Sequence, residues 1–212
     1  MWSANPLDGI DLSVLEFLAS HRNPVVDLVP VTLGVAGTDV VTMAVLQTLA
    51  LVIALFARAW RQLAAVVLAV GIAGTGVSAL KDVIARPRPP ADLTMLAGEG
   101  FAFPSTHAAF TSAAATAFVA VTAWRSRRAR AVVTALLGAA VALVGFSMVY
   151  LGSHWVSDVL VGWLIGVPLG AGLGRLLRRR PRADGEALPS RGSTGSRGAT
   201  DEDAPVSDHG SV

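Results

Sequence analysis

The sequence predicts an all-α integral membrane protein, a helical bundle with five or six transmembrane helices. Of its 212 residues, 53% are hydrophobic and only 15% are charged, whereas a soluble domain usually carries about 25% charged residues. Five apolar stretches approach the roughly 20 residues that a helix needs to cross a hydrocarbon core of about 30 Å. The basic residues gather in a few short segments between and after these stretches.

The five apolar stretches are the predicted spanning helices. Apart from Asp158 in the last one, they contain no Lys, Arg, Asp or Glu. Ala, Gly and Val dominate several of them, which favours close packing of helices in lipid. A soluble bundle of buried helices is the alternative, but five such stretches in one short chain argue against it. The stretches are residues 40–57, 62–80, 104–123, 131–150 and 155–174.

The two ends of the chain differ from this apolar centre. Residues 1–38 are predicted to form an amphipathic, interfacial segment, with a helix over residues 11–21. Residues 25–37 either lie in the interface, dip partway into the bilayer or form a sixth span, and the sequence leaves these alternatives open. The transmembrane domain is predicted over residues 39–177. Residues 178–212 are rich in Gly, Ser, Pro, Asp and Arg, and are therefore predicted to be a disordered tail.

The positions of the basic residues predict the orientation. Residues 58–61, 125–130 and 175–182 carry most of the clustered arginines. With five spans, all three segments fall on the same side of the membrane, and the positive-inside rule assigns that side to the cytoplasm. The tail is then cytoplasmic in a multi-pass protein of the cell membrane. The connections over residues 81–103 and 151–154 are predicted to be extracytoplasmic.

Two cations lie in the first of these outward connections. Lys81 and Arg88 can supply fixed positive charge to a phosphate, and an arginine can bind two of its oxygens at once. Prolines beside Arg88 stiffen the chain that carries it. Anchoring of a helix end at lipid headgroups is the simpler explanation. However, cations on the outer side run against the positive-inside bias, which favours a functional interpretation.

Residues 104–107 open the third apolar stretch with a second polar group. Ser105 and Thr106 lie where a helix should begin after a proline, and the free backbone N–H groups there are suited to bind an anion. Simple N-capping is the alternative for Ser105, and both roles are compatible. His107 projects from the same first turn.

The third polar group is a histidine–aspartate pair. His154 and Asp158 are four residues apart, so on a helix they lie on one face. A carboxylate bound to one imidazole nitrogen fixes the tautomer and leaves the other nitrogen free to attack. A structural hydrogen bond between helices is the alternative. Membrane topology brings this pair to the same face as the other two groups.

In this order and spacing, the three groups resemble the type 2 phosphatidic acid phosphatase superfamily, which also includes vanadium-dependent haloperoxidases. That family's first block, a Lys, six residues and Arg-Pro, is matched by residues 81–89. The second, Pro-Ser-Gly-His, is matched by residues 104–107 with Thr106 in the glycine position. The third, Ser-Arg, five residues, His, three residues and Asp, is matched by Ser147, His154 and Asp158, but Met148 occupies the arginine position.

The resemblance implies a metal-independent phosphatase without a cofactor. His154 would attack phosphorus to form a phosphohistidine, Asp158 would support it, and His107 would protonate the leaving oxygen and later activate water. The residues implied to hold the phosphoryl oxygens are Lys81, Arg88, Ser105 and Thr106 through its backbone. Met148 leaves three alternatives: Arg86 compensates for the missing arginine, the substrate differs, or the protein is weakly active or inactive.

The predicted function is dephosphorylation of a lipid phosphate or polyprenyl diphosphate. Phosphatidic acid, phosphatidylglycerol phosphate and undecaprenyl diphosphate all fit, and nothing in the sequence separates them. A non-catalytic binder or transporter of lipid phosphates is the alternative that Met148 favours. A purely structural membrane module leaves the outward cations and the His154–Asp158 pair unexplained. The expected partners are the substrate and membrane lipids and include no nucleic acid, and the sequence does not indicate an oligomeric state.

Overall fold

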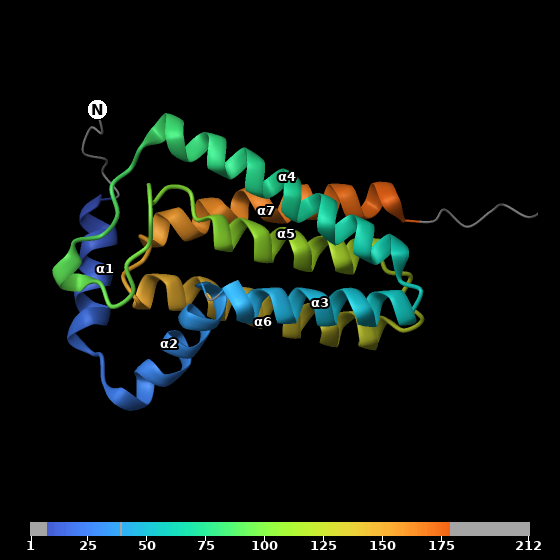
Figure 1. The fold of residues 1–212 in the computed structure, drawn as a ribbon, viewed down its shortest axis with the longest axis horizontal. Helices are drawn as coiled ribbons and strands as arrows, with labels where there is room; N and C mark the ends of the chain where they lie inside the picture. The colour runs from blue at the N-terminus through green and yellow to red at the C-terminus, as the bar shows by residue number, and fades with distance from the viewer. Residues whose placement is uncertain (1–7, 39, 179–212) are drawn as a thin grey trace, which may run out of the picture. The chain divides into compact units, whose positions relative to one another are not determined.

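The computed structural model describes residues 8–38 and 40–178, and within them all regular structure is helical (Figure 1). This confirms the all-α prediction. Most of the predicted tail, residues 179–212, lies outside the described residues. The elements are α1 (Asp8–Ser20), α2 (Pro24–Thr38), α3 (Val40–Phe56), α4 (Trp60–Ile84), the short 3-10 helix η1 (Ala91–Leu93), α5 (Thr106–Val121), α6 (Arg127–Tyr150) and α7 (Val156–Leu177).

Each predicted apolar stretch corresponds to one helix, from α3 to α7. Helices α4, α6 and α7 contain 25, 24 and 22 residues and are long and apolar enough to cross a membrane. Helices α3 and α5 are shorter, at 17 and 16 residues. The positions of the predicted helices are therefore confirmed, whereas the number of spans stays a prediction.

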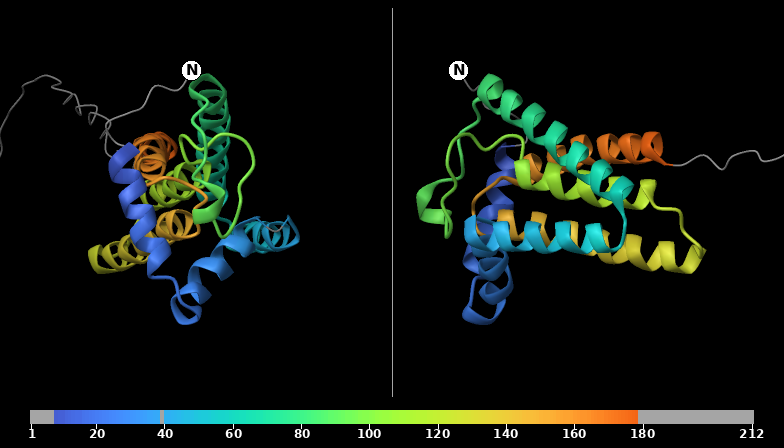
Figure 2. Two further views of the ribbon diagram at one scale, coloured as in Figure 1. Left: turned by 90° about the vertical axis from the view of Figure 1, so that its left-hand side faces the viewer. Right: turned by 45° about the vertical axis from the view of Figure 1, so that its right-hand side comes forward.

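Helices α3 to α7 run along the long axis, and α1 and α2 lie across one end of them (Figures 1 and 2). Helix α5 packs against α4, α6 and α7, and its most extensive contact is with α7. The helix predicted over residues 11–21 begins at Asp8, and residues 24–38 form α2, which contains Pro30. Whether α2 enters the bilayer stays open.

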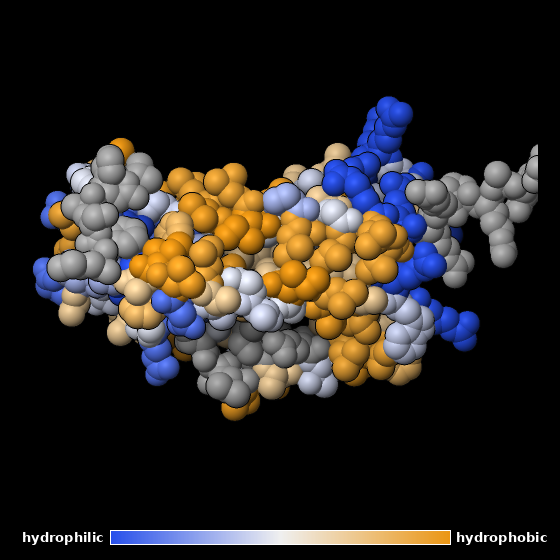
Figure 3. Space-filling model, turned by 90° about the horizontal axis from the view of Figure 1, so that it is seen from above, coloured by the Kyte–Doolittle hydropathy of each residue, from blue (hydrophilic) through white to orange (hydrophobic). Residues whose placement is uncertain are grey.

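The outer surface of the bundle is strongly apolar. Leu164 is 72% exposed and Leu136 is 66% exposed, and Figure 3 shows hydrophobic side chains along the middle of one face, with hydrophilic ones nearer the ends. Exposing so large an apolar surface to water would be energetically unfavourable, whereas the lipid tails of a membrane can cover it. Together with the long apolar helices, this surface identifies a membrane protein.

Glycines on α7 allow its close approach to α5. Gly162, Gly166, Gly170 and Gly174 recur every four residues, so they form one stripe along the helix. A Cβ atom added at Gly162 would lie 2.7 Å from the carbonyl oxygen of Ser105, and one at Gly174 would lie 2.5 Å from that of Ala117. Helix α5 presents alanines in return, which matches the small-residue interfaces of helices in lipid.

We expect Gly166→Leu to destabilise the bundle by about 1–3 kcal/mol, the usual cost of overpacking a tight interface. A side chain at this position would overlap Ser112 and the backbone of Ala109 on α5. The control is Gly172→Leu on the same helix, where an added Cβ meets nothing within 4 Å. Thermal unfolding in detergent measures the difference, and equal midpoints for the two variants would contradict the close packing.

Candidate active site

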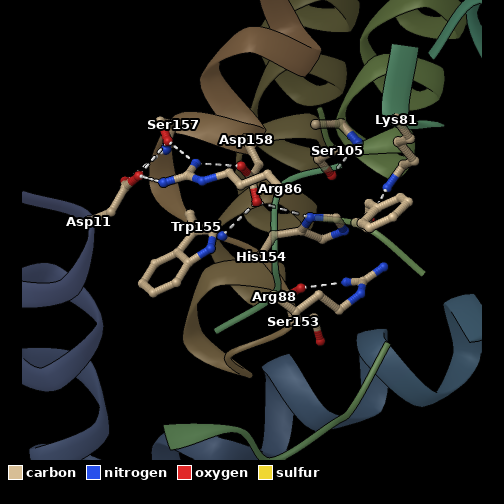
Figure 4. Close-up of polar contacts among 12 residues, drawn as sticks. Asp11, Lys81, Arg86, Arg88, Ser105, Ser153, His154, Trp155, Ser157 and Asp158 are labelled. Carbon is tan, nitrogen blue, oxygen red and sulfur yellow. Dashed lines mark hydrogen bonds and ion pairs between the residues drawn. The ribbon is translucent and has the colours of Figure 1, made fainter. Parts of the chain in front are cut away.

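The three predicted polar groups line a single cavity at the end of the bundle that α1 and α2 cross. The cavity has a volume of about 910 Å³. Its lining includes Lys81, Arg88, Thr106, His107 and His154. The predicted convergence of segments that are far apart in the sequence is therefore confirmed, and Figure 4 shows several of these side chains together.

Backbone carbonyl groups hold the two cations at the cavity. Lys81 Nζ donates to the carbonyl oxygen of Phe101 at 2.8 Å. The Arg88 guanidinium donates to the carbonyl oxygens of Glu99 at 2.7 Å and Ser153 at 2.5 Å. In the described part of the chain, neither cation has a carboxylate oxygen within 4 Å. Their positive charges are oriented by neutral groups and remain available to an anion.

The start of α5 brings a histidine to the cavity. Ser105 is the N-cap, and its hydroxyl accepts from the backbone N–H of Ala108 at 3.4 Å. Ser105 is fully buried, and its own backbone N–H donates to the carbonyl oxygen of Asp158 at 3.0 Å. The N-capping role of Ser105 is confirmed. Thr106 and His107, in the first turn of α5, line the cavity.

His154 lies in the tight turn between α6 and α7. The backbone N–H groups of Ser153 and His154 both donate to the carbonyl oxygen of Met148, at 3.0 and 3.2 Å. Gly152 takes a left-handed φ of 72°, and a Cβ atom there would lie 2.5 Å from the carbonyl oxygen of Leu93. This turn requires glycine at that position, and it aims the imidazole towards Lys81 and Arg88 (Figure 4).

The imidazole of His154 faces Asp158 with one nitrogen. His154 Nδ1 lies 3.5 Å from Asp158 Oδ2, and it has no hydrogen-bond partner among the described residues. This distance exceeds that of an ordinary hydrogen bond, and such contacts often tighten only when substrate is bound. Burial lowers the pKa of His154, although the nearby Asp158 carboxylate opposes the shift. A lowered pKa favours the neutral ring, whose unprotonated nitrogen is chemically able to act as a nucleophile.

Asp158 is completely buried and fixed from two sides. Its Oδ1 accepts from Arg86 Nη1 at 2.7 Å, and its Oδ2 accepts from the backbone N–H of Trp155 at 3.0 Å. The second bond caps the N-terminus of α7. The carboxylate that faces His154 thus has a defined position.

Arg86, which the sequence offered as one of three alternatives for the missing arginine, lies outside the cavity. Its guanidinium is bound by Asp158, by Asp8 and Asp11 of α1, each at 2.8 Å, and by Ser157 at 2.6 Å. Burial alone would lower the pKa of Arg86, but the hydrogen bond to Asp11 and the charge of Asp158 outweigh it and raise that pKa. The side chain is 4% exposed and does not line the cavity. The structure gives Arg86 a different place from the one that compensation for the missing arginine requires.

Three further lining residues contribute to the charge distribution of the cavity, one of them neutral and two of them acidic. Met148 is 4% exposed and lines the cavity with a neutral side chain, beside the turn that its carbonyl oxygen holds. Asp82 and Glu99 also belong to the lining, and the sequence gave no reason to place these carboxylates there. The lining of the cavity therefore contains one lysine, one arginine, two histidines and two acidic residues.

Two solved structures have a similar fold. One is described as the first transmembrane PAP2-type phosphatidylglycerolphosphate phosphatase from Bacillus subtilis; it has a TM-score of 0.68 and 23% identity, with 81% of this chain and 86% of that chain covered. The other is Aquifex aeolicus LpxE, with a TM-score of 0.59 and 25% identity, covering 77% of this chain and 94% of that chain. No curated protein sequence matches the chain.

The family assignment rests on the sequence match, which includes every helix that lines the site except α2. The family model of the PAP2 superfamily matches residues 59–182, more than half of the chain. That range contains the two cations, both cavity histidines and Asp158. The chain belongs to the PAP2 superfamily.

Proposed function

We propose that the protein is a membrane phosphatase that hydrolyses a lipid phosphate or a polyprenyl diphosphate in the cavity at the α1–α2 end. The convergence of Lys81, Arg88, His107 and His154 on one cavity of an apolar helical bundle carries the proposal. One of the two similar structures supports it, because that protein is described as a phosphatidylglycerolphosphate phosphatase. We place the cavity on the extracytoplasmic side, on the distribution of basic residues.

The proposed reaction proceeds in two steps. In the first, the imidazole nitrogen of His154 that faces away from Asp158 attacks phosphorus, and the bond from phosphorus to the leaving oxygen breaks. His107 gives its proton to that oxygen. In the second step, His107 takes a proton from water, the water oxygen attacks the phosphohistidine, and the nitrogen–phosphorus bond breaks to release inorganic phosphate.

The two cations stabilise the negative charge of the transition state. Lys81 and Arg88 face the three phosphoryl oxygens over which the transition state spreads its negative charge. Asp158 stabilises the positive charge that develops on His154, and Arg86 keeps that carboxylate in position. The lipid tail would lie against the exposed apolar helices while the headgroup enters the cavity.

Phosphate release by the purified protein in detergent with excess chelator tests the proposal. The substrates are phosphatidic acid, phosphatidylglycerol phosphate and undecaprenyl diphosphate. We expect release from at least one of them to survive the chelator. A folded protein that releases phosphate from none of them, yet binds them, would overturn the proposal in favour of the non-catalytic binder.

We expect the pKa of His154 in the folded protein to lie below the ordinary histidine value of about 6.5. The unfolded chain then binds the proton more tightly, so His154 makes stability fall as the pH drops below about 6.5. NMR titration of ¹⁵N-labelled histidines measures the pKa directly, and the signal missing in His154→Ala gives the assignment. A midpoint above 6.5 would contradict the effect of burial.

We expect Met148→Arg to raise phosphate release by tenfold or more, because it restores a cationic donor at the arginine position of the third block. A donor aimed at the developing charge is worth roughly 100- to 1000-fold, and part of this gain is offset by burying a third cation near Lys81 and Arg88. Met148→Leu keeps the neutral volume and is the control, with activity expected to be unchanged. Unchanged or lower activity in Met148→Arg would show that Met148 is not a deficit.

A further inference from the structure

A second cavity lies at the opposite end of the bundle from the candidate active site. It has a volume of about 270 Å³ and is formed by α5, α6 and α7. Three arginines line it, Arg130 at the start of α6 and Arg175 and Arg178 at the end of α7. The rest of the lining is mainly small or apolar, including Leu137, Gly138, Val141 and Val167.

Among the described residues, the three arginines form a positive cluster without a neighbouring acidic group. All three are exposed, and no Asp or Glu belongs to the lining of the cavity. Within residues 8–38 and 40–178, none of them has a carboxylate oxygen within 4 Å. Figure 3 shows hydrophilic side chains gathered near this end of the molecule. One guanidinium group can bind two phosphate oxygens at once, so the cluster is suited to a phosphate group.

The depth of the apolar part suits an acyl chain. Val167 and Arg175 are eight residues apart on α7, which corresponds to about 12 Å along the helix axis. This approaches half of a hydrocarbon core of about 30 Å, the thickness of one leaflet. Gly138 on α6 leaves open space, since a Cβ atom added there meets nothing within 4 Å.

We propose that this cavity binds an anionic phospholipid of the leaflet opposite the candidate active site. Its phosphate lies between Arg130, Arg175 and Arg178. One acyl chain occupies the apolar part of the cavity, which we call the groove between α6 and α7. The described lining of this cavity contains no histidine, the residue type proposed as the nucleophile in the first cavity, so the lipid is bound here and not hydrolysed. This site is independent of the proposed phosphatase activity.

Native mass spectrometry of the full-length protein, titrated with phosphatidylglycerol or with phosphatidylcholine of the same chain length, tests the proposal. We expect phosphatidylglycerol to bind at least tenfold more tightly than phosphatidylcholine. The triple variant Arg130→Gln, Arg175→Gln, Arg178→Gln should lose this preference. The matched control replaces Arg125, Arg127 and Arg128 by Gln, which removes the same charge from exposed residues outside the lining, and it should keep the preference.

Two further measurements distinguish a lipid site from general attraction of anions. Gly138→Phe fills the groove and should weaken phosphatidylglycerol binding at least fivefold, whereas Gly172→Phe, with open space on α7 outside the lining, should not. Equal losses in the two triple variants would overturn the proposal in favour of nonspecific electrostatic binding. Unchanged binding in Gly138→Phe, or full displacement by an equal concentration of inorganic phosphate, would overturn the part played by the acyl chain.

Discussion

Replacing His154 by alanine is expected to reduce phosphate release by roughly 10⁴-fold or more, the scale seen when an enzyme loses its nucleophile. His154 is held by the turn after α6, lies in the cavity with both cations, and has a pKa that burial lowers. The measurement is initial phosphate release at saturating substrate, with folding verified by thermal unfolding.

The control for this variant is His21→Ala, which removes an exposed histidine from the turn that follows α1. We expect it to keep wild-type activity. A phosphohistidine should also be detected in His107→Ala after quenching in alkali, in which the nitrogen–phosphorus bond is stable, because loss of the proposed general base slows hydrolysis of the intermediate. Retention of more than about a tenth of the activity in His154→Ala would exclude His154 as nucleophile, whatever the trapping shows.

Local sequence patterns were sufficient to predict the helices and the groups that meet in the cavity. An apolar stretch of fixed length predicts a helix because each backbone polar group in lipid needs an internal partner. Because successive connections between spanning helices lie on alternating sides of the membrane, the connections over residues 81–103 and 151–154 are expected at the same end of the bundle. The cavity that contains Lys81, His107 and His154 confirms that placement.

The pairing of Arg86 could not be predicted, because it depends on packing between distant segments. Asp8 and Asp11 precede Arg86 by 78 and 75 positions, and the amphipathic pattern of α1 suggests only that its polar face meets water. In the structure Asp11 is 2% exposed, whereas Phe17, an apolar residue of the same helix, is 60% exposed. In a membrane protein an apolar residue can face lipid and a carboxylate can face the protein interior, so the amphipathic pattern alone does not predict which side of α1 is buried.

The role of the backbone at Met148 was hidden for a related reason. The sequence shows only that an arginine is missing from the third block, because side chains alone define such a pattern. The structure shows that the Met148 carbonyl oxygen accepts from both Ser153 and His154 and so shapes the turn that presents the histidine. Any residue at this position can supply that carbonyl group, which explains how the turn persists without the arginine.

Replacing Arg86 is expected to produce the second largest effect, on stability and activity together. Arg86→Gln removes the positive charge shared by Asp8, Asp11 and Asp158, and breaking a buried ion pair by removing one partner typically costs about 3–5 kcal/mol. Thermal and denaturant unfolding in detergent measure this loss. Arg127→Gln is the control, since Arg127 is exposed at the far end of the bundle and should have no comparable effect.

A purely structural role for Arg86 is distinguished from a positioning role by the pKa of His154. Removing a nearby positive charge while Asp158 keeps its negative charge favours the protonated imidazole, so Arg86→Gln should raise the pKa of His154. The activity of the remaining folded protein should then decline at a higher pH on the acid side than that of the wild type. Asp11→Asn separates the two roles further, because it weakens the contact with α1 but leaves the bond from Arg86 to Asp158 intact. If Arg86→Gln lowers stability without moving the pKa of His154, Arg86 only fastens α1 to the bundle. If the pKa rises in Arg86→Gln and not in Asp11→Asn, Arg86 holds the carboxylate that makes His154 a nucleophile.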